Sequence, residues 1–458
     1  MTTPFPFEPL VVFGFLSAMM IAGILLRATV PVFQKILFPA SLIGGLMGLG
    51  LINLDVISID AETVKAFAYH FFNISFISVG LTPPETGEKK QSPKAYPEEA
   101  GGPSKDGTIV RGSLWMALVQ AVTFPAQALI GAFFVFMFAL GGTTLFNTFG
   151  FLLPLGFNEG PGQALSFGKV WEGAGFVDAS TIGLAFATIG FFFSFFVGVP
   201  LANVRLKKEK YRVEAPPLFL STGILQKGEP PQSAGGLTIH NSSLDTLAFH
   251  FAQVGFVYVM TYLFLFFLSG LLPPGMASMI WGFFFIFGLV FAMLLRLLVD
   301  ISPYSHLLNP PLQRRITGFS VDYLIVSTGC AIELFVLKAY IAPILLISLT
   351  GGAATTLIVF ILGRNLSDYA LERSLAIYGV VTGTVSSGLM LLRIVDPELK
   401  TPVAREIGFM NIFAVPVVGG LTCLVNAPLW WGWSLFTTCL VFLLVLAIAF
   451  IVLLKKTF

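Results

Sequence analysis

The chain has 458 residues, of which 56% are hydrophobic and only 11% are charged, and it contains 48 Phe. Soluble domains carry roughly 25% charged residues, so this composition excludes an ordinary soluble protein and predicts an all-α polytopic membrane protein. The formal net charge of +2 comes without any basic cluster interleaved with aromatics, so nucleic acid is not an expected partner. The three cysteines lie in apolar segments without metal-ligand spacing and are interpreted as small core residues.

Apolar runs of about 20 residues, enough to span a bilayer, form two similar sets. The first set comprises 9–27, 33–54, 64–81, 113–140 and 181–203, with an interrupted apolar segment at 145–175. The second comprises 247–271, 275–298, 321–337, 339–362 and 403–425, with an interrupted segment at 371–395. A last run at 430–454 follows. Polar loops are expected at 82–112 and 301–318, and a cytoplasmic linker at 204–244.

The positive charges test this map, because Lys and Arg collect on the cytoplasmic side of a membrane. With the N-terminus outside and the C-terminus inside, most of them fall on inside loops; Lys65, Lys169 and Lys338 are the exceptions. Each set has five crossings, an odd number, so the second set is inserted upside down. We therefore expect inverted repeats at 1–203 and 245–426, followed by a C-terminal transmembrane helix within 427–458.

The two interrupted segments are the most informative part of the chain. Residues 156–163 and 382–388 are short, polar and rich in Gly at predicted membrane depth. Irregular backbone is tolerated there only where protein or a water-filled cavity satisfies its polar groups. Such a pair, in corresponding places of two halves, is typical of the substrate site of a secondary transporter. We expect two re-entrant hairpins that enter from opposite faces and meet near the midplane.

The candidate substrate-binding residues all come from these two stretches and the segment just after the second. Glycines allow close approach of the backbone to a ligand, and helix N-termini at the tips favour an anion. The alternative is that the glycines are packing positions between helices. The candidates are Asn158, Glu159, Gly160, Gly162, Gln163, Thr382, Gly383, Thr384, Ser386, Ser387 and Arg393, the last as a partner for a substrate carboxylate.

Two acidic residues lie in apolar surroundings, where a bare charge costs roughly 2.5–3.5 kcal/mol or more. Glu159 is expected to bind a cation, to be protonated, or to lie close to the outer surface. Glu333, expected inside a span, is either functional or paired with a basic residue: Arg364, Arg393 or Lys338. The residues proposed to line an ion path are Asn73, Ser78, Glu333 and Asn411.

Other residues in the spans are given structural roles. His70 and His250 are expected to be hydrogen-bonded core or interface residues, since neither has a partner at metal spacing. Gly183, Gly190 and Gly198, spaced seven and eight residues apart, are expected to form a stripe for close helix packing.

Several stretches together resemble the bacterial sodium/glutamate symporter family. They are Pro-Ala-Ser-Leu-Ile-Gly-Gly at 39–45, the segment 72–81 ending Val-Gly-Leu, Gly-Pro-Gly-Gln at 160–163, the segments 183–190 and 198–203, 383–388, Pro-Val-Val-Gly at 416–419, and Asn426. The resemblance covers most of both halves. It departs from the family at the first hairpin, where a His-Gly-Thr type motif is replaced by Asn158-Glu159-Gly160-Pro161-Gly162. An ionised Glu159 would repel an acidic ligand, which bears on the substrate.

The resemblance implies a Na⁺-coupled symporter of an anionic amino acid such as glutamate, in the bacterial cytoplasmic (inner) membrane. It also implies a homodimer formed by a scaffold domain, and a transport domain that carries both hairpins in an elevator-type cycle. Na⁺ is then the coupling ion, and no other cofactor is expected.

Other classes of protein remain open at this stage. The chain shows no nucleotide-binding loop, zinc spacing or serine-hydrolase elbow, so we do not expect an enzyme or an ATP-driven pump. A gated channel also uses re-entrant loops. An H⁺-coupled carrier or exporter with Glu159 or Glu333 as the proton site, and a membrane scaffold without transport, are the remaining alternatives.

Overall fold

The computed structural model describes residues 5–82, 106–208, 221–225, 227–228, 234–240, 242–397 and 399–455. These residues form helices and turns, with no strand among them. Nine helices in this part of the chain are long and apolar enough to cross a membrane, which confirms the polytopic membrane class. Most of the predicted 82–112 loop and the centre of the predicted linker lie outside the described residues.

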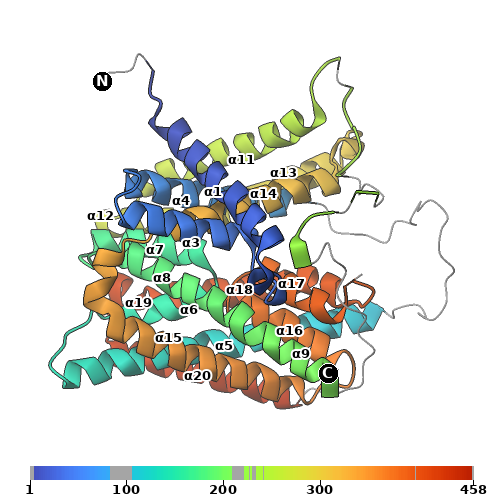
Figure 1. Cartoon of the computed structure of the whole chain (residues 1–458). Helices are drawn as coiled ribbons and strands as arrows, with labels where there is room; N and C mark the ends of the chain where they lie inside the picture. The colour runs from blue at the N-terminus through green and yellow to red at the C-terminus, as the bar shows by residue number, and fades with distance from the viewer. Residues whose placement is uncertain are drawn as a thin grey trace. The chain divides into compact units, whose positions relative to one another are not determined.

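Figure 1 shows the helices of the chain. The first half contains α1 (Glu8–Thr29), α2 (Pro31–Lys35), α3 (Ala40–Asn53), α4 (Ala61–Leu81), α5 (Asp106–Leu140), α6 (Leu152–Phe157), α7 (Pro161–Gly173), α8 (Ala179–Phe192) and α9 (Gly198–Lys208). The second contains α11 (Thr246–Ser269), α12 (Pro274–Met279), α13 (Phe284–Asp300), α14 (Pro310–Cys330), α15 (Leu334–Gly363), α16 (Ala370–Val381), α17 (Val385–Val395) and α18 (Val403–Val425). α19 (Ala427–Trp430) and α20 (Leu435–Lys455) close the chain. The inverted relation of the halves stays a prediction.

Both predicted interruptions are present. The helix α6 ends before Asn158 and α7 begins at Pro161, with Gly160 between them at φ +88°. A glycine adopts this left-handed backbone without the strain that a side chain would bring, and proline suits the first position of a helix. In the second segment α16 ends at Val381, and the Thr384 hydroxyl caps α17 by accepting a hydrogen bond from the backbone N–H of Ser387.

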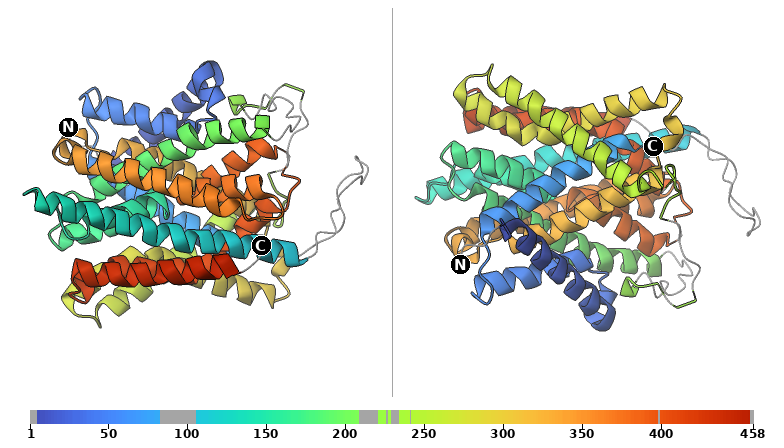
Figure 2. Two further views of the ribbon diagram at one scale, coloured as in Figure 1. Left: turned by 90° about the horizontal axis from the view of Figure 1, so that it is seen from below. Right: turned by 90° about the horizontal axis from the view of Figure 1, so that it is seen from above.

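The chain divides into two compact units, each with residues from both halves. Unit 1 comprises Met1–Ala68, Asp106–Lys227 and Tyr323–Phe458, and unit 2 comprises Tyr69–Lys105 and Gly228–Asp322. Unit 1 holds both interrupted segments. Within it α5 packs along α18 and α20, and the teal and red helices of Figure 2 (left) show the second of these pairs.

Unit 2 is held together by apolar packing and by a few buried hydrogen bonds. Its apolar core includes Ile77, Val254 and Phe284. The buried His250 ring lies between the backbone carbonyl of Thr246 at Nδ1 and the backbone N–H of Asn309, which donates to Nε2. The expectation of a hydrogen-bonded core residue is confirmed for His250. His70 is exposed and bonds the Tyr258 hydroxyl.

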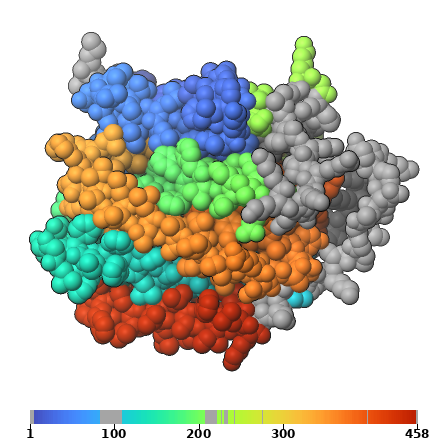
Figure 3. Space-filling model, turned by 60° about the horizontal axis from the view of Figure 1, so that its bottom comes forward, coloured from blue at the N-terminus to red at the C-terminus, as the bar shows by residue number. Residues whose placement is uncertain are grey.

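The outer faces of α15 and α20 carry exposed large apolar side chains. Figure 3 shows both helices on one face of the molecule, in orange and red. The exposed residues include Leu345, Leu346, Leu349, Leu357 and Ile361 on α15, and Leu440, Leu443, Leu444, Ile448 and Ile451 on α20. Contiguous apolar stripes of this kind are stable against lipid rather than water.

The predicted span 321–337 and the loop 301–318 are wrong. The helix α14 begins at Pro310 inside the predicted loop and ends at Cys330, and a break follows before α15 starts at Leu334. Asn53 of α3 holds this break: its amide donates to the carbonyl of Ile332 at 2.9 Å and accepts from the N–H of Leu334 at 2.7 Å. The break therefore depends on a residue far away in the sequence.

Glu333 consequently does not lie inside a span. It occupies the N-cap position of α15, and its side chain is 44% exposed. Its carboxylate bonds Lys65 at 2.9 Å, and the Lys65 side chain is only 7% exposed. The predicted partners Arg364, Arg393 and Lys338 are therefore replaced by a residue from α4.

Candidate functional site

The two hairpin tips touch each other within unit 1. We call residues 158–160 tip 1 and residues 382–384 tip 2. A Cβ added to Gly160 would lie 3.1 Å from the backbone oxygen of Gly383 and 3.3 Å from Cγ2 of Thr384. Gly160 is the N-cap residue of α7 and Thr384 that of α17. The N-terminal ends of two half-helices therefore meet at one point.

One face of α5 bonds tip 1 and the residue just before tip 2. The amide of Asn158 donates to the Thr123 hydroxyl at 2.9 Å. The Gln127 amide donates both to the carbonyl of Val381, beside tip 2, at 3.1 Å and to the Thr355 hydroxyl of α15 at 3.0 Å. The role of these polar residues of α5 was not predicted from the sequence. Its signal was present, because residues 120, 123 and 127 are polar, lie in an apolar span and fall on one helical face.

The hydroxyl groups at and beside tip 2 have protein partners. Thr382 Oγ1 donates to the carbonyl of Tyr378 and lies 2.7 Å from the Ser194 hydroxyl. Ser194 belongs to a π-helical turn, Phe193–Val197, that joins α8 to α9. The Tyr378 hydroxyl donates to the carbonyl of Phe193 in the same turn at 3.2 Å. π-Turns inside α-helices are frequent at functional sites, and this one braces tip 2.

Tip 1 is different, because several of its buried polar atoms have no partner. Oδ1 of Asn158, Oε1 of Glu159 and both amide atoms of Gln163 are buried and form no hydrogen bond. Gln163 is 0% exposed and Asn158 is 4% exposed. On the facing side of α5, Oε1 of Gln120 and of Gln127 are also unpaired. Since most buried polar groups in proteins are bonded, such a cluster calls for an explanation.

The glycine stripe on α8 and α9 packs against both hairpins, as expected. A Cβ on Gly183 would lie 2.8 Å from the carbonyl oxygen of Ala164 in α7. One on Gly190 would lie 2.6 Å from the carbonyl oxygen of Thr382, and one on Gly198 would lie 2.8 Å from the Leu391 side chain of α17. The stripe is therefore a packing surface that fixes the hairpins.

The remaining predicted substrate residues are not all at the tips. Gly162 and Ser387 are buried, whereas Ser386 is exposed. Arg393 is exposed in the last turn of α17, about 13 Å along the helix from Thr384 at 1.5 Å per residue. The structure thus places Arg393 away from the tip, and its role as a carboxylate partner stays a prediction.

The four residues proposed for an ion path are spread over the chain. The Asn73 amide donates to the carbonyl of Tyr69, and its Oδ1 is buried and unpaired. The Ser78 hydroxyl donates to the carbonyl of Gln313 and accepts from the Gln313 amide, both within unit 2. Glu333 is paired with Lys65, and Asn411 is half-buried on α18. Ser78 and Glu333 are thus bonded to other protein groups and not left open for an ion.

Several other charged side chains of unit 1 form two sets of ion pairs. Arg373 of α16 forms two hydrogen bonds with Glu406 of α18, at 2.8 and 2.6 Å, and both side chains are at most 2% exposed. Near the start of α4, Lys65 and Lys169 link the carboxylates of Glu62, Glu172 and Glu333. Beside this network, burial and then the Glu333 and Glu172 carboxylates raise the pKa of Asp178 above its ordinary value.

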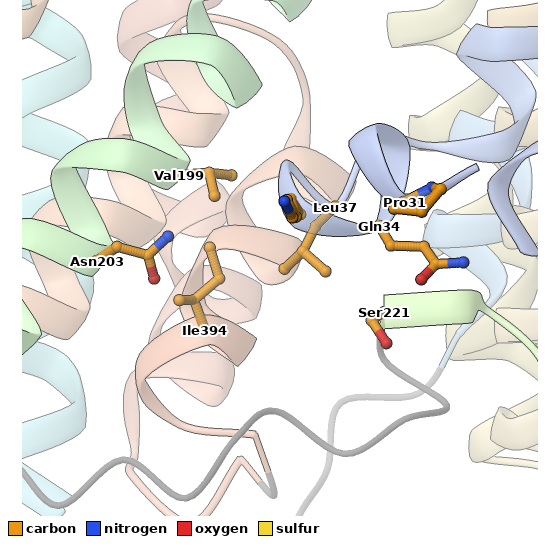
Figure 4. A pocket seen from close by; sticks show the side chains of 8 residues that line it. Pro31, Gln34, Leu37, Val199, Asn203, Ser221 and Ile394 are labelled. Carbon is orange, nitrogen blue, oxygen red and sulfur yellow. The ribbon is translucent and has the colours of Figure 1, made fainter.

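Unit 1 also contains a cavity of about 310 Å³, shown in Figure 4. It lies at the far end of α17 from tip 2, as Ile394 in its wall shows. The other lining residues are Pro31, Gln34, Lys35, Leu37, Val199, Asn203 and Ser221. The cavity is thus lined by one cationic and several neutral polar side chains together with apolar ones.

The chain matches no known protein-family description and no curated protein sequence. The likeness to the sodium/glutamate symporter family therefore stays an expectation from the motifs.

Proposed function

We propose that the protein is a secondary active transporter that binds a small solute where tips 1 and 2 meet. The observation that carries this proposal is the close approach of the two tips, which leaves so little space that a Cβ on Gly160 would lie 3.1 Å from the Gly383 carbonyl oxygen and 3.3 Å from Cγ2 of Thr384. Two interrupted helices that converge on one point inside a membrane protein provide backbone groups for a ligand without exposing them to lipid.

The chemistry of the tips supports a ligand that carries both negative and positive charge. Because α7 and α17 both begin there, their free N–H groups and dipoles favour a carboxylate. The unpaired oxygens of Asn158, Glu159 and Gln163 favour a positive charge. We propose Na⁺-coupled symport of a small amino acid, glutamate or a related organic anion, by an elevator-type cycle in a homodimer in the bacterial inner membrane.

Coupling requires that solute and Na⁺ each bind better when the other is present. The test is uptake into proteoliposomes that hold the purified protein. We expect saturable uptake of a radiolabelled amino acid that depends on an inward Na⁺ gradient and stops when an ionophore dissipates it. Flux that never saturates would instead indicate a channel.

Proton coupling is a second candidate, favoured by the unpaired Oε1 of Glu159. Uptake driven by a pH gradient in the absence of Na⁺ would support it, and the loss of that uptake in Glu159→Gln would assign the proton to this residue.

A further inference from the structure

The side chains around tip 1 have more unpaired acceptors than donors. The unpaired buried acceptors are Oδ1 of Asn158, Oε1 of Glu159 and Oε1 of Gln163 in the hairpin, and Oε1 of Gln120 and of Gln127 on the face of α5 whose Thr123 bonds Asn158. The unpaired donor in the same group of side chains is the Gln163 amide nitrogen. A ligand that satisfies this group must therefore bring mainly N–H donors or positive charge.

The Glu159 charge has no basic partner among the described residues. Arg373 is paired with Glu406, Lys65 and Lys169 belong to the network around Glu62, and Arg393 is exposed. The helix α8 has no charged residue, and α5 has none after Arg111. Tyr378 of α16 directs its hydroxyl to the carbonyl of Phe193. The Gln163 side chain approaches the Glu159 carboxyl group, but an amide is neutral.

We infer that the transported solute carries a protonated amino group, which binds at tip 1. This inference rests on the proposed function and narrows its substrate class. The Glu159 carboxylate takes the charge of the ammonium group, and the amide oxygens of Asn158, Gln127 and Gln163 accept its N–H bonds. The solute carboxylate then faces the N-termini of α7 and α17.

The same geometry selects between neutral and acidic amino acids. Glu159 compensates one ammonium group, and the helix N-termini favour one carboxylate. A second carboxylate, as in glutamate, meets no basic side chain among the described residues around the tips, since Arg393 is exposed at the far end of α17. The tips therefore suit a solute with one amino and one carboxylate group, such as a neutral α-amino acid.

The test is a thermal-unfolding screen of the purified full-length protein. The probes are the standard L-amino acids and the matching carboxylic acids without the amino group, each measured in Na⁺ and in K⁺ buffers. A ligand that binds the folded state raises the melting temperature. We expect a rise with one or more neutral L-amino acids, a smaller rise or none with glutamate, and none with the amine-free acids.

Variants separate recognition from folding. Because a charge-assisted bond is lost, Glu159→Gln is expected to weaken the apparent Kd for the amino acid at least about tenfold. Without ligand it should melt at or above the wild-type temperature, because a buried uncompensated charge has been removed. Glu172→Gln, on the same hairpin but in the ion network, should bind like the wild type.

Four results would each overturn the inference. Two come from the screen: stabilisation by amine-free acids, or stabilisation by none of the amino acids. Two come from the variant: an unchanged Kd in Glu159→Gln, or a Glu159 effect that follows the alkali-cation concentration and not the amine. Binding that requires the amine but is not followed by uptake into proteoliposomes would refute the transport function and leave the recognition intact. Uptake of amine-free acids would support the transport function and refute the recognition of an amino group.

Discussion

Tips 1 and 2 are both short polar stretches that contain a glycine, yet their hydrogen bonding differs. At tip 2 the Thr382 hydroxyl is bonded to Tyr378 and Ser194. At tip 1 Oδ1 of Asn158 and Oε1 of Glu159 are buried and unpaired. A segment whose polar groups are satisfied by the protein keeps its shape without a ligand, whereas unsatisfied buried groups need partners from elsewhere. The difference indicates that tip 2 supports the site and tip 1 recognises the solute.

The largest expected effect comes from filling the contact between the tips. Gly160→Leu and Gly383→Leu should each abolish uptake while folded protein is still produced. At Gly160 a side chain would meet the backbone of Gly383 and would adopt a positive φ, at a cost of about 1–2 kcal/mol for the backbone alone. At Gly383 a Cβ would lie 2.8 Å from the Ser387 hydroxyl. Uptake is measured in proteoliposomes.

The matched control is Gly173→Leu at the other end of α7, where a Cβ has nothing within 4 Å. This variant should transport normally. Normal transport by either tip variant would contradict the placement of the site.

The second effect tests whether a buried acid of unit 1 needs its basic partner. Arg373→Ala leaves Glu406, which is 0% exposed, without a counter-charge, so we expect a loss of about 3–5 kcal/mol in the free energy of unfolding. The exposed Arg364→Ala should change it by less than about 0.5 kcal/mol. Denaturant unfolding in detergent measures both. Equal stability of the two variants would show that the buried Glu406 does not need Arg373 as a partner.

The third effect concerns Gln127 of α5, which bonds the residue just before tip 2. Gln127→Leu removes the donor to the Val381 carbonyl and to the Thr355 hydroxyl, which should cost about 1–3 kcal/mol because a buried carbonyl is left unpaired. Uptake should fall at the same time, since the position of tip 2 relaxes. A variant as stable and active as the wild type would show that α5 does not hold the tip.

The smallest expected effects on stability come from two substitutions, one at tip 2 and one beside tip 1. Thr382→Val removes a paired hydroxyl and should cost about 1 kcal/mol while leaving the apparent Kd for the solute near its wild-type value. Gln163→Leu removes an amide with no partner, so it should leave stability within about 0.5 kcal/mol and weaken solute binding. The reverse pattern in paired unfolding and binding measurements would exchange the roles of the two tips.

Local signals explain which parts of the fold could be predicted. Gly160-Pro161 and the polar residues 382–384 break an apolar run by themselves, so both interruptions were visible in the sequence. The break before Glu333 was not, because residues 330–332 are apolar and contain no Gly or Pro. Asn53 stabilises that break from α3, and no local pattern reports such a contact.

The candidate site was predicted only in part, because only some of its residues give a local signal in the sequence. The stretches that carry it were identified, but the contribution of α5 was missed although Gln120, Thr123 and Gln127 fall on one face of that apolar helix. Arg393 was placed beside tip 2 from its nearness in sequence to Gly388. A helix rises 1.5 Å per residue, so even this short separation carries its side chain away from the tip.

The π-helical turn Phe193–Val197 has a consequence for the uneven spacing of three glycines. Each residue of an α-helix advances about 100° around the axis, so a step of seven returns almost to the starting direction and a step of eight overshoots by about 80°. Gly190 and Gly198 are eight apart, but the turn between them accommodates one residue more than an α-turn. The extra residue restores the phase, so Gly198 points the same way as Gly183 and Gly190. Deleting one residue from 193–197 would rotate all of α9 away from α16 and α17.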